Sequence, residues 1–153
     1  MSWLILLVVF LTALSGSLVT AKGLLWYYSQ LTLPAWTPTG QIIGSVWSFI
    51  FILTALSALI VWNKRHHYRA NATAIWITLL VNAVLNVGWC AVFFGLHMLS
   101  LSILVAGLLA LSVVVAIVQI WPKSKLAGLL LVPYAAWASF ATYLTVVICW
   151  LNK

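Results

Sequence analysis

The uncharged stretch "MLSLSILVAGLLALSVVVAIVQIW" at residues 98–121 decides the fold class of this chain. A helix needs about 20 mainly apolar residues to cross the hydrocarbon core of a membrane, and this run is long enough to do so. The stretch therefore predicts a transmembrane helix.

Four further apolar segments satisfy the same criterion, and they cover residues 3–21, 42–62, 72–96 and 126–151. None of the five segments contains Lys, Arg, Asp or Glu. Most of the connectors are short, which forces neighbouring helices to run antiparallel. The sequence predicts an all-α membrane protein whose single domain, residues 1–153, is a five-transmembrane-helix bundle. We interpret the first span as an uncleaved helix, because the positively charged start of a signal peptide is missing.

The composition excludes several classes of chemistry. Of the 153 residues, 66% are hydrophobic, seven are Lys or Arg, and none is Asp or Glu. Without carboxylates the chain cannot build a paired-carboxylate acid–base site, a Ser-His-Asp triad, an EF-hand or a carboxylate proton relay within the membrane. Cys90 and Cys149 lie in apolar runs without a CxxC spacing, so we interpret them as buried, inert thiols.

The charged residues predict an orientation. Five Lys and Arg fall in connectors on the same side as the N-terminus (Lys64, Arg65, Arg69, Lys123 and Lys125), against Lys22 and Lys153 on the other side. We expect a bacterial cell membrane, and in such a membrane the positive-inside rule predicts the N-terminus in the cytoplasm and the long 23–41 connector outside. His66 and His67 are adjacent, so their side chains diverge on a helix, and we expect no metal site. We also expect no nucleic-acid partner; membrane lipids are the expected surroundings.

Polar and aromatic residues of the third span recur on one helical face, at Asn82, Asn86, Trp89 and Phe93. Amides facing lipid would be costly, so this face should point into the bundle. Two readings stay open and are compatible: the amides bond neighbouring helices, or they contact a ligand. Trp47, Trp89 and Trp137 lie away from the span ends, where an indole N–H needs a partner. Flat rings with a few amides suit a flat, apolar, aromatic ligand.

Other spacings concern packing. Thr12, Gly16 and Thr20 recur every four residues on the first span, as do Ala106 and Ala110 on the fourth. Such small residues allow close helix approach, either within the bundle or between subunits. Pro133 should kink the fifth span, and a neighbouring helix or hydroxyl should satisfy the carbonyl it leaves free.

Five stretches together resemble the TspO/MBR family of tryptophan-rich sensory proteins and mitochondrial translocator proteins, also known as peripheral benzodiazepine receptors. They are "WYYSQL" (26–31), "PAWTP" (34–38), "VWSFIF" (46–51), "LNVGWCAVFFG" (85–95) and "PYAAWASFATYL" (133–144). The resemblance implies a five-helix bundle, commonly a homodimer, with a pocket near the first connector. It also implies porphyrin ligands such as protoporphyrin IX or haem, possible isoquinoline carboxamide-type ligands, and no required cofactor.

The resemblance further implies the pocket contacts. They would be Tyr27 and Pro38 in the connector, Ile43, Trp47 and Phe51 in the second span, Asn86 and Trp89 in the third, and Trp137, Phe140, Ala141 and Leu144 in the fifth. Where the family often has tyrosine, this chain has Phe51, which removes a hydroxyl from the pocket. The cholesterol motif of the animal members is incomplete here, because Tyr143 is followed by a basic residue only at Lys153.

Three functions remain open at this stage. The leading hypothesis is a membrane sensor or regulator that binds tetrapyrroles. The alternative is a light- and oxygen-dependent porphyrin-degrading enzyme, for which the resemblance would make Trp47 and Trp137 the catalytic pair. A porphyrin or lipid transporter is disfavoured, because the spans lack charged relay groups and internal repeats.

The stretch "LTLPAWTPTGQ" (31–41) is interpreted as a lid over the pocket. Pro34 and Pro38 fix the backbone φ angle and lack N–H donors, so they favour a defined irregular path at the membrane surface. Trp36 would anchor that path at the interface. The alternative is a stiff loop with no role in ligand binding.

Overall fold

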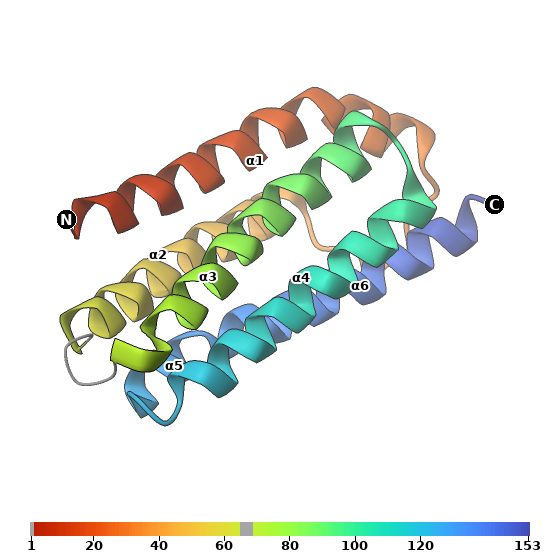
Figure 1. Ribbon diagram of the computed structural model, residues 1–153. Coiled ribbons are helices and arrows are strands. Elements are labelled where there is room, and N and C mark those ends of the chain that lie inside the picture. The colour runs from red at the N-terminus through yellow and green to blue at the C-terminus, as the bar shows by residue number, and fades with distance from the viewer. Residues whose placement is uncertain (1, 65–68) are drawn as a thin grey trace.

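The computed structural model describes residues 2–64 and 69–153 of the chain, and its helices form one elongated bundle (Figure 1). The long helices are α1 (Trp3–Gln30), α2 (Gly40–Lys64), α3 (Arg69–Cys90), α4 (Leu99–Ile120) and α6 (Val132–Leu151). A π-helical turn, η2 (Ala91–Gly95), continues α3, and a short helix, α5 (Lys125–Leu130), precedes α6.

Five helical segments are long and apolar enough to cross a membrane, which confirms the predicted fold class. They are Trp3–Gln30, Gly40–Lys64, Ala72–Gly95, Leu99–Ile120 and Lys125–Leu151. The two chain ends lie at opposite ends of the bundle, as an odd number of crossings requires (Figure 1). The protein is therefore a multi-pass membrane protein.

The first connector is shorter than the sequence predicted. We expected it to begin at Gly23, but α1 continues to Gln30, so Tyr27 lies in a helix and not in the connector. Gly23 does not end α1; it packs there, because a Cβ at this position would lie 2.4 Å from the Phe94 carbonyl oxygen. Helices usually end before the residue that precedes a proline, and here the end comes shortly before Leu33 and Pro34.

The fifth span is interrupted where Pro133 predicted a kink. Helix α5 ends at Leu130 and α6 begins at Val132, with Pro133 in its first turn, where no N–H is needed. The Ser57 hydroxyl of α2 donates to the Ala127 carbonyl at 2.8 Å. A hydroxyl from a neighbouring helix thus bonds a carbonyl close to the break. This is not the carbonyl of Leu129, four residues before Pro133, which is the one that the proline leaves without its helical N–H donor.

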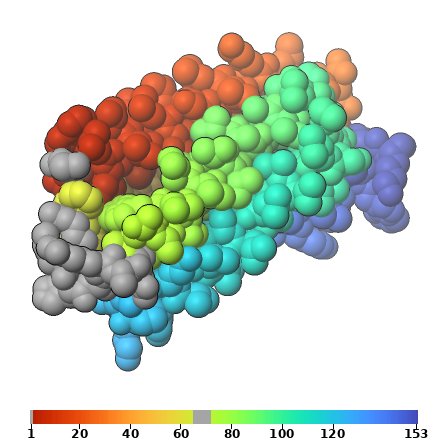
Figure 2. Space-filling model, in the orientation of Figure 1, coloured from red at the N-terminus to blue at the C-terminus, as the bar shows by residue number. Residues whose placement is uncertain are grey.

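The predicted small-residue stripe of α1 packs inside the bundle at Gly16. A Cβ added there would meet the Cys90 sulfur at 3.4 Å and the Asn86 side-chain oxygen at 3.8 Å, so α1 lies close to α3. In the space-filling view α1 forms one long edge of the molecule beside α3 (Figure 2). Cys90 and Cys149 are free and buried, which agrees with the interpretation of both as buried thiols.

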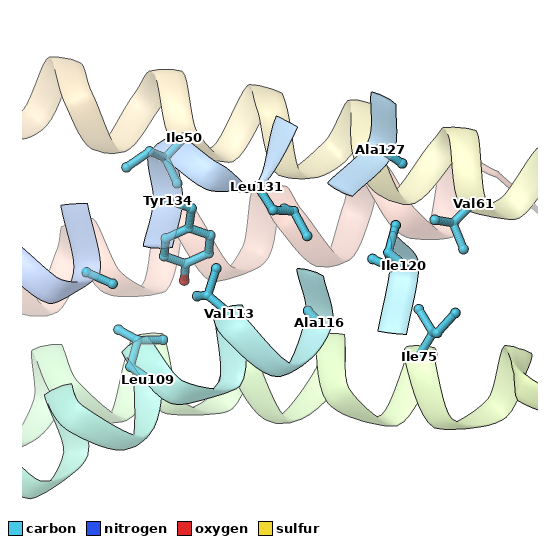
Figure 3. Packing of buried hydrophobic residues seen from close by; sticks show 11 residues of the cluster. Ile50, Val61, Ile75, Leu109, Val113, Ala116, Ile120, Ala127, Leu131 and Tyr134 are labelled. Carbon is cyan, nitrogen blue, oxygen red and sulfur yellow. The ribbon is translucent and has the colours of Figure 1, made fainter. Parts of the chain in front are cut away.

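A hydrogen-bond network centred on Tyr134 connects three helices. The Tyr134 hydroxyl donates to the Asn82 side-chain oxygen at 3.0 Å and accepts from the Asn86 amide at 3.2 Å. The Asn82 amide donates to the Ser112 hydroxyl of α4 at 2.9 Å. Figure 3 shows the Tyr134 ring between Ile50 of α2 and the apolar residues of α4. The predicted structural role of both asparagines is thus confirmed.

Removing the Tyr134 hydroxyl should destabilise the bundle. Tyr134→Phe leaves the Asn82 oxygen and the Asn86 amide short of a partner, and each buried unpaired group costs about 1–3 kcal/mol. We expect a lower thermal unfolding midpoint in nanodiscs. Tyr143→Phe is the matched control, because Tyr143 is 60% exposed. Equal midpoints for the two variants would contradict the role of the network.

Candidate functional site

A large cavity occupies the half of the bundle that ends in the 31–39 loop. Its volume is about 1310 Å³, above the roughly 300–1,000 Å³ of ordinary ligand pockets. Its walls come from the C-terminal part of α1, the N-terminal part of α2, the α3–η2 segment and α6. Antiparallel packing brings these segments, distant in the sequence, to the same end of the bundle.

All the predicted contact residues except Pro38 line this cavity. They are Tyr27, Ile43, Trp47, Phe51, Asn86, Trp89, Trp137, Phe140, Ala141 and Leu144. Tyr27 reaches it from α1, since the helix extends beyond the predicted connector. Pro38 lies in the loop and is not among the described residues that line the cavity.

Tryptophan rings form much of the cavity wall. The centroids of Trp47 and Trp89 are 6.3 Å apart, and those of Trp89 and Phe93 are 5.8 Å apart in a stacked arrangement. Trp137 lies beside Phe140, with centroids 5.1 Å apart. The wall therefore presents extended flat surfaces of the kind that pack against a planar ligand.

Two of these indoles carry an N–H that is buried and unpaired. The Nε1 atoms of Trp89 and Trp137 have no hydrogen-bond partner among the described residues and are covered by neighbouring atoms. A buried donor without an acceptor costs about 1–3 kcal/mol. A small rotation of either ring toward a ligand that carries an acceptor atom would remove this penalty.

The cavity has little charge to offer a ligand. Among the described residues that line it, none is Lys, Arg or His; the polar groups are amides and hydroxyls such as Asn86, Gln41 and Tyr28. Charged groups are costly to bury without a partner. The interior therefore suits an uncharged, planar body, and a charged substituent would have to remain at the end of the cavity where Gln41 and Tyr28 are exposed.

The 31–39 loop is fastened to the end of α6. The Thr32 N–H donates to the Asn152 side-chain oxygen at 2.8 Å, and the Asn152 amide donates to the Thr32 carbonyl at 3.0 Å. Trp36 stacks on Tyr143, with centroids 5.6 Å apart, and meets the edge of Phe140 at 6.0 Å. Because Phe140 also lines the cavity, the loop contacts the cavity wall from outside.

Sequence reasoning missed several cavity residues. Gly16 and Thr20 were interpreted as packing positions only, yet both line the cavity. Phe93 lies on the predicted Asn82 face but was not assigned to the site, although that periodicity could have found it. Tyr28 also lines the cavity, and Asn152 holds the 31–39 loop. No sequence pattern pointed to either residue, because their roles depend on contacts between segments that are distant in the sequence.

Of the three histidines in the sequence, His97 lies within the described residues. His66 and His67 lie outside the described residues. His97 has a positive φ of 57° and its ring stacks on Trp26 with centroids 3.9 Å apart, so it has a partner that the sequence did not reveal. In the described part of the chain no three His or Cys residues gather as metal ligands.

Comparison with known proteins finds relatives that match most of the chain. The TspO/MBR family profile matches residues 4–151. The chain is 36% identical over 143 residues to the tryptophan-rich protein TspO of Chlorobaculum tepidum, covering 90% of this chain and 87% of that protein. It is 35% identical to the uncharacterized membrane protein YtaB of Bacillus subtilis, over 89% of this chain and 90% of that protein.

The similarity extends to animal proteins. Identity to the human translocator protein is 28% over 126 residues, which cover 82% of this chain and 74% of that protein. The residues matched by the family profile, 4–151, include nearly all of the five apolar helices and all the residues that line the large cavity. The chain belongs to the TspO/MBR family.

Proposed function

We propose that this protein binds a tetrapyrrole such as protoporphyrin IX or haem in the large cavity and acts as a membrane sensor or regulator of porphyrin level. The observation that carries the proposal is the convergence of Trp47, Trp89 and Trp137 with Asn86 on one cavity of about 1310 Å³. Flat aromatic walls match a planar macrocycle, and family membership favours the same ligand class. An isoquinoline carboxamide would satisfy the same shape and supply a carbonyl acceptor.

The lack of charge inside the cavity sets the expected pose. The macrocycle would lie between the indoles, and its propionates would remain near Gln41 and Tyr28, where water can solvate them. The indole N–H groups of Trp89 and Trp137 are the donors available to an acceptor on the buried part.

Titration with protoporphyrin IX tests the proposal. In nanodiscs it should quench tryptophan fluorescence saturably, and the Trp47→Phe/Trp137→Phe variant should bind at least about tenfold more weakly, since base–aromatic stacking of similar rings is worth roughly 1–3 kcal/mol per contact. Trp150→Phe is the matched control, because Trp150 is 71% exposed. A non-saturable signal, or equal affinity in both variants, would refute binding in this cavity.

The same samples under light distinguish the enzymatic alternative. If the protein degrades porphyrin, illumination in oxygen should remove porphyrin absorbance and form a new product faster with the native chain than with the Trp47→Phe/Trp137→Phe variant. Equal rates would leave binding as the function.

We propose that the 31–39 loop is the lid of this cavity. Its two hydrogen bonds to Asn152 hold it against the end of α6.

Asn152→Ala should accelerate porphyrin release about fivefold to thirtyfold in stopped-flow displacement, the range for a loss of about 1–2 kcal/mol. Pro34→Ala with Pro38→Ala should act in the same direction by loosening the path of the loop. Asn63→Ala, at the far end of α2, is the control, and an unchanged release rate in the first two variants would exclude a lid.

We further propose a homodimer in a bacterial cell membrane with the N-terminus in the cytoplasm. Lys64 and Lys125 lie at the ends of α2 and α5 that share the N-terminal end of the bundle, which favours this orientation (Figure 1). A thiol reagent that does not cross the membrane should label Ala35→Cys and not Lys125→Cys in intact cells. The reverse pattern would invert the topology, and light scattering in nanodiscs that gives one chain would exclude the dimer.

A further inference from the structure

A second cavity lies in the opposite half of the bundle, between α1, α2 and α3. Its volume is about 220 Å³. It is lined by the N-terminal part of α1, from Leu4 to Thr12, and by Thr54 and Ala58 of α2 and Leu79 and Ala83 of α3. Among the described residues that line it, none carries a charge.

Three polar residues that line this cavity already have hydrogen-bond partners within the protein. Asn82 and Tyr134 line it, but their polar atoms are occupied by each other and by Ser112 and Asn86. The Thr12 hydroxyl donates to the Val8 carbonyl at 2.8 Å. These groups therefore need no hydrogen bond from a molecule bound in the cavity.

Thr54 is the exception. Its hydroxyl is buried without a partner among the described residues, whereas those of Thr12, Thr142 and Thr145 each donate to a carbonyl one turn earlier. The hydroxyl oxygen is covered, but the side chain lines the cavity. A change between staggered χ1 wells would turn the hydroxyl toward the cavity, where an occupant could pair with it.

The cavity is also open to the lipid phase. Leu4, Val8 and Leu80 line it and are 38%, 43% and 58% exposed, so its α1–α3 side faces the bilayer. A molecule dissolved in the hydrocarbon could enter without crossing water. An engineered apolar cavity of about 150 Å³ holds benzene, so this one is large enough for a single substituted ring.

We propose that this cavity is a second binding site, for a small uncharged aromatic molecule with one hydrogen-bonding group, such as a phenol, that pairs with Thr54. The site is separate from the proposed tetrapyrrole cavity. Phe51 lines both cavities and its ring lies 5.9 Å from that of Trp47, so an occupant of the small cavity contacts a wall of the large one.

The test follows alanine methyl groups by NMR in nanodiscs, with 4-fluorophenol as the probe. The methyl resonances of Ala58 and Ala83 should shift saturably, while that of Ala74, which is exposed and lines neither cavity, should not. Filling the cavity with Ala83→Leu should abolish the shift at Ala58. No porphyrin is present in this experiment. A negative result with 4-fluorophenol therefore does not affect the tetrapyrrole proposal, and a negative result with protoporphyrin IX does not affect the proposal of a small-cavity site.

Thr54→Val tests the pairing with the hydroxyl. It should weaken 4-fluorophenol about fivefold, the factor for a hydrogen bond of about 1 kcal/mol, and leave fluorobenzene unchanged. Equal effects on both probes would overturn the role of Thr54. Three other results would overturn the site itself. The shifts could fail to saturate, they could be confined to Ala141 of the large cavity, or lipid acyl chains could contact Ala58 without being displaced by the probe.

Discussion

The hydrogen bonds that join Tyr134 to Asn82 and Asn86 hold the middle of the bundle together. Lipid offers no partners for polar groups, so a buried amide in a membrane helix must find its partner on another helix. Here two amides one turn apart on α3 share one hydroxyl from α6, and Ser112 extends the network to α4. The register of these three helices is thereby fixed at one level.

Both cavities lie next to this fixed level. Asn86 lines the large cavity, whereas Asn82 and Tyr134 line the small one, so the network forms part of the partition between them. Phe51 completes that partition from α2. Without these hydrogen bonds the helices could move together and fill the cavities, because packing between apolar helices in lipid favours close contact.

Sequence periodicity predicted much of this arrangement. The five spans, the inward face of Asn82 and Asn86, and the break at Pro133 follow from apolar length, helical spacing and the chemistry of proline. The end of α1 did not follow, because Gly23 resembles a helix end and only its packing on Phe94 shows otherwise. The Thr32–Asn152 contact was also beyond reach, because it joins residues 120 positions apart.

Most of the buried polar groups that lack a hydrogen-bond partner lie beside one of the two cavities. The bundle satisfies the asparagines and Tyr134, yet leaves the indole N–H of Trp89 and Trp137 beside one cavity and the Thr54 hydroxyl beside the other. A membrane protein loses stability at each such group. The Gln119 side-chain oxygen is also buried without a partner among the described residues, but Gln119 lines neither cavity. The groups that an occupant could pair with are therefore Trp89 and Trp137 at the large cavity and Thr54 at the small one, and these are the groups on which the two binding proposals depend.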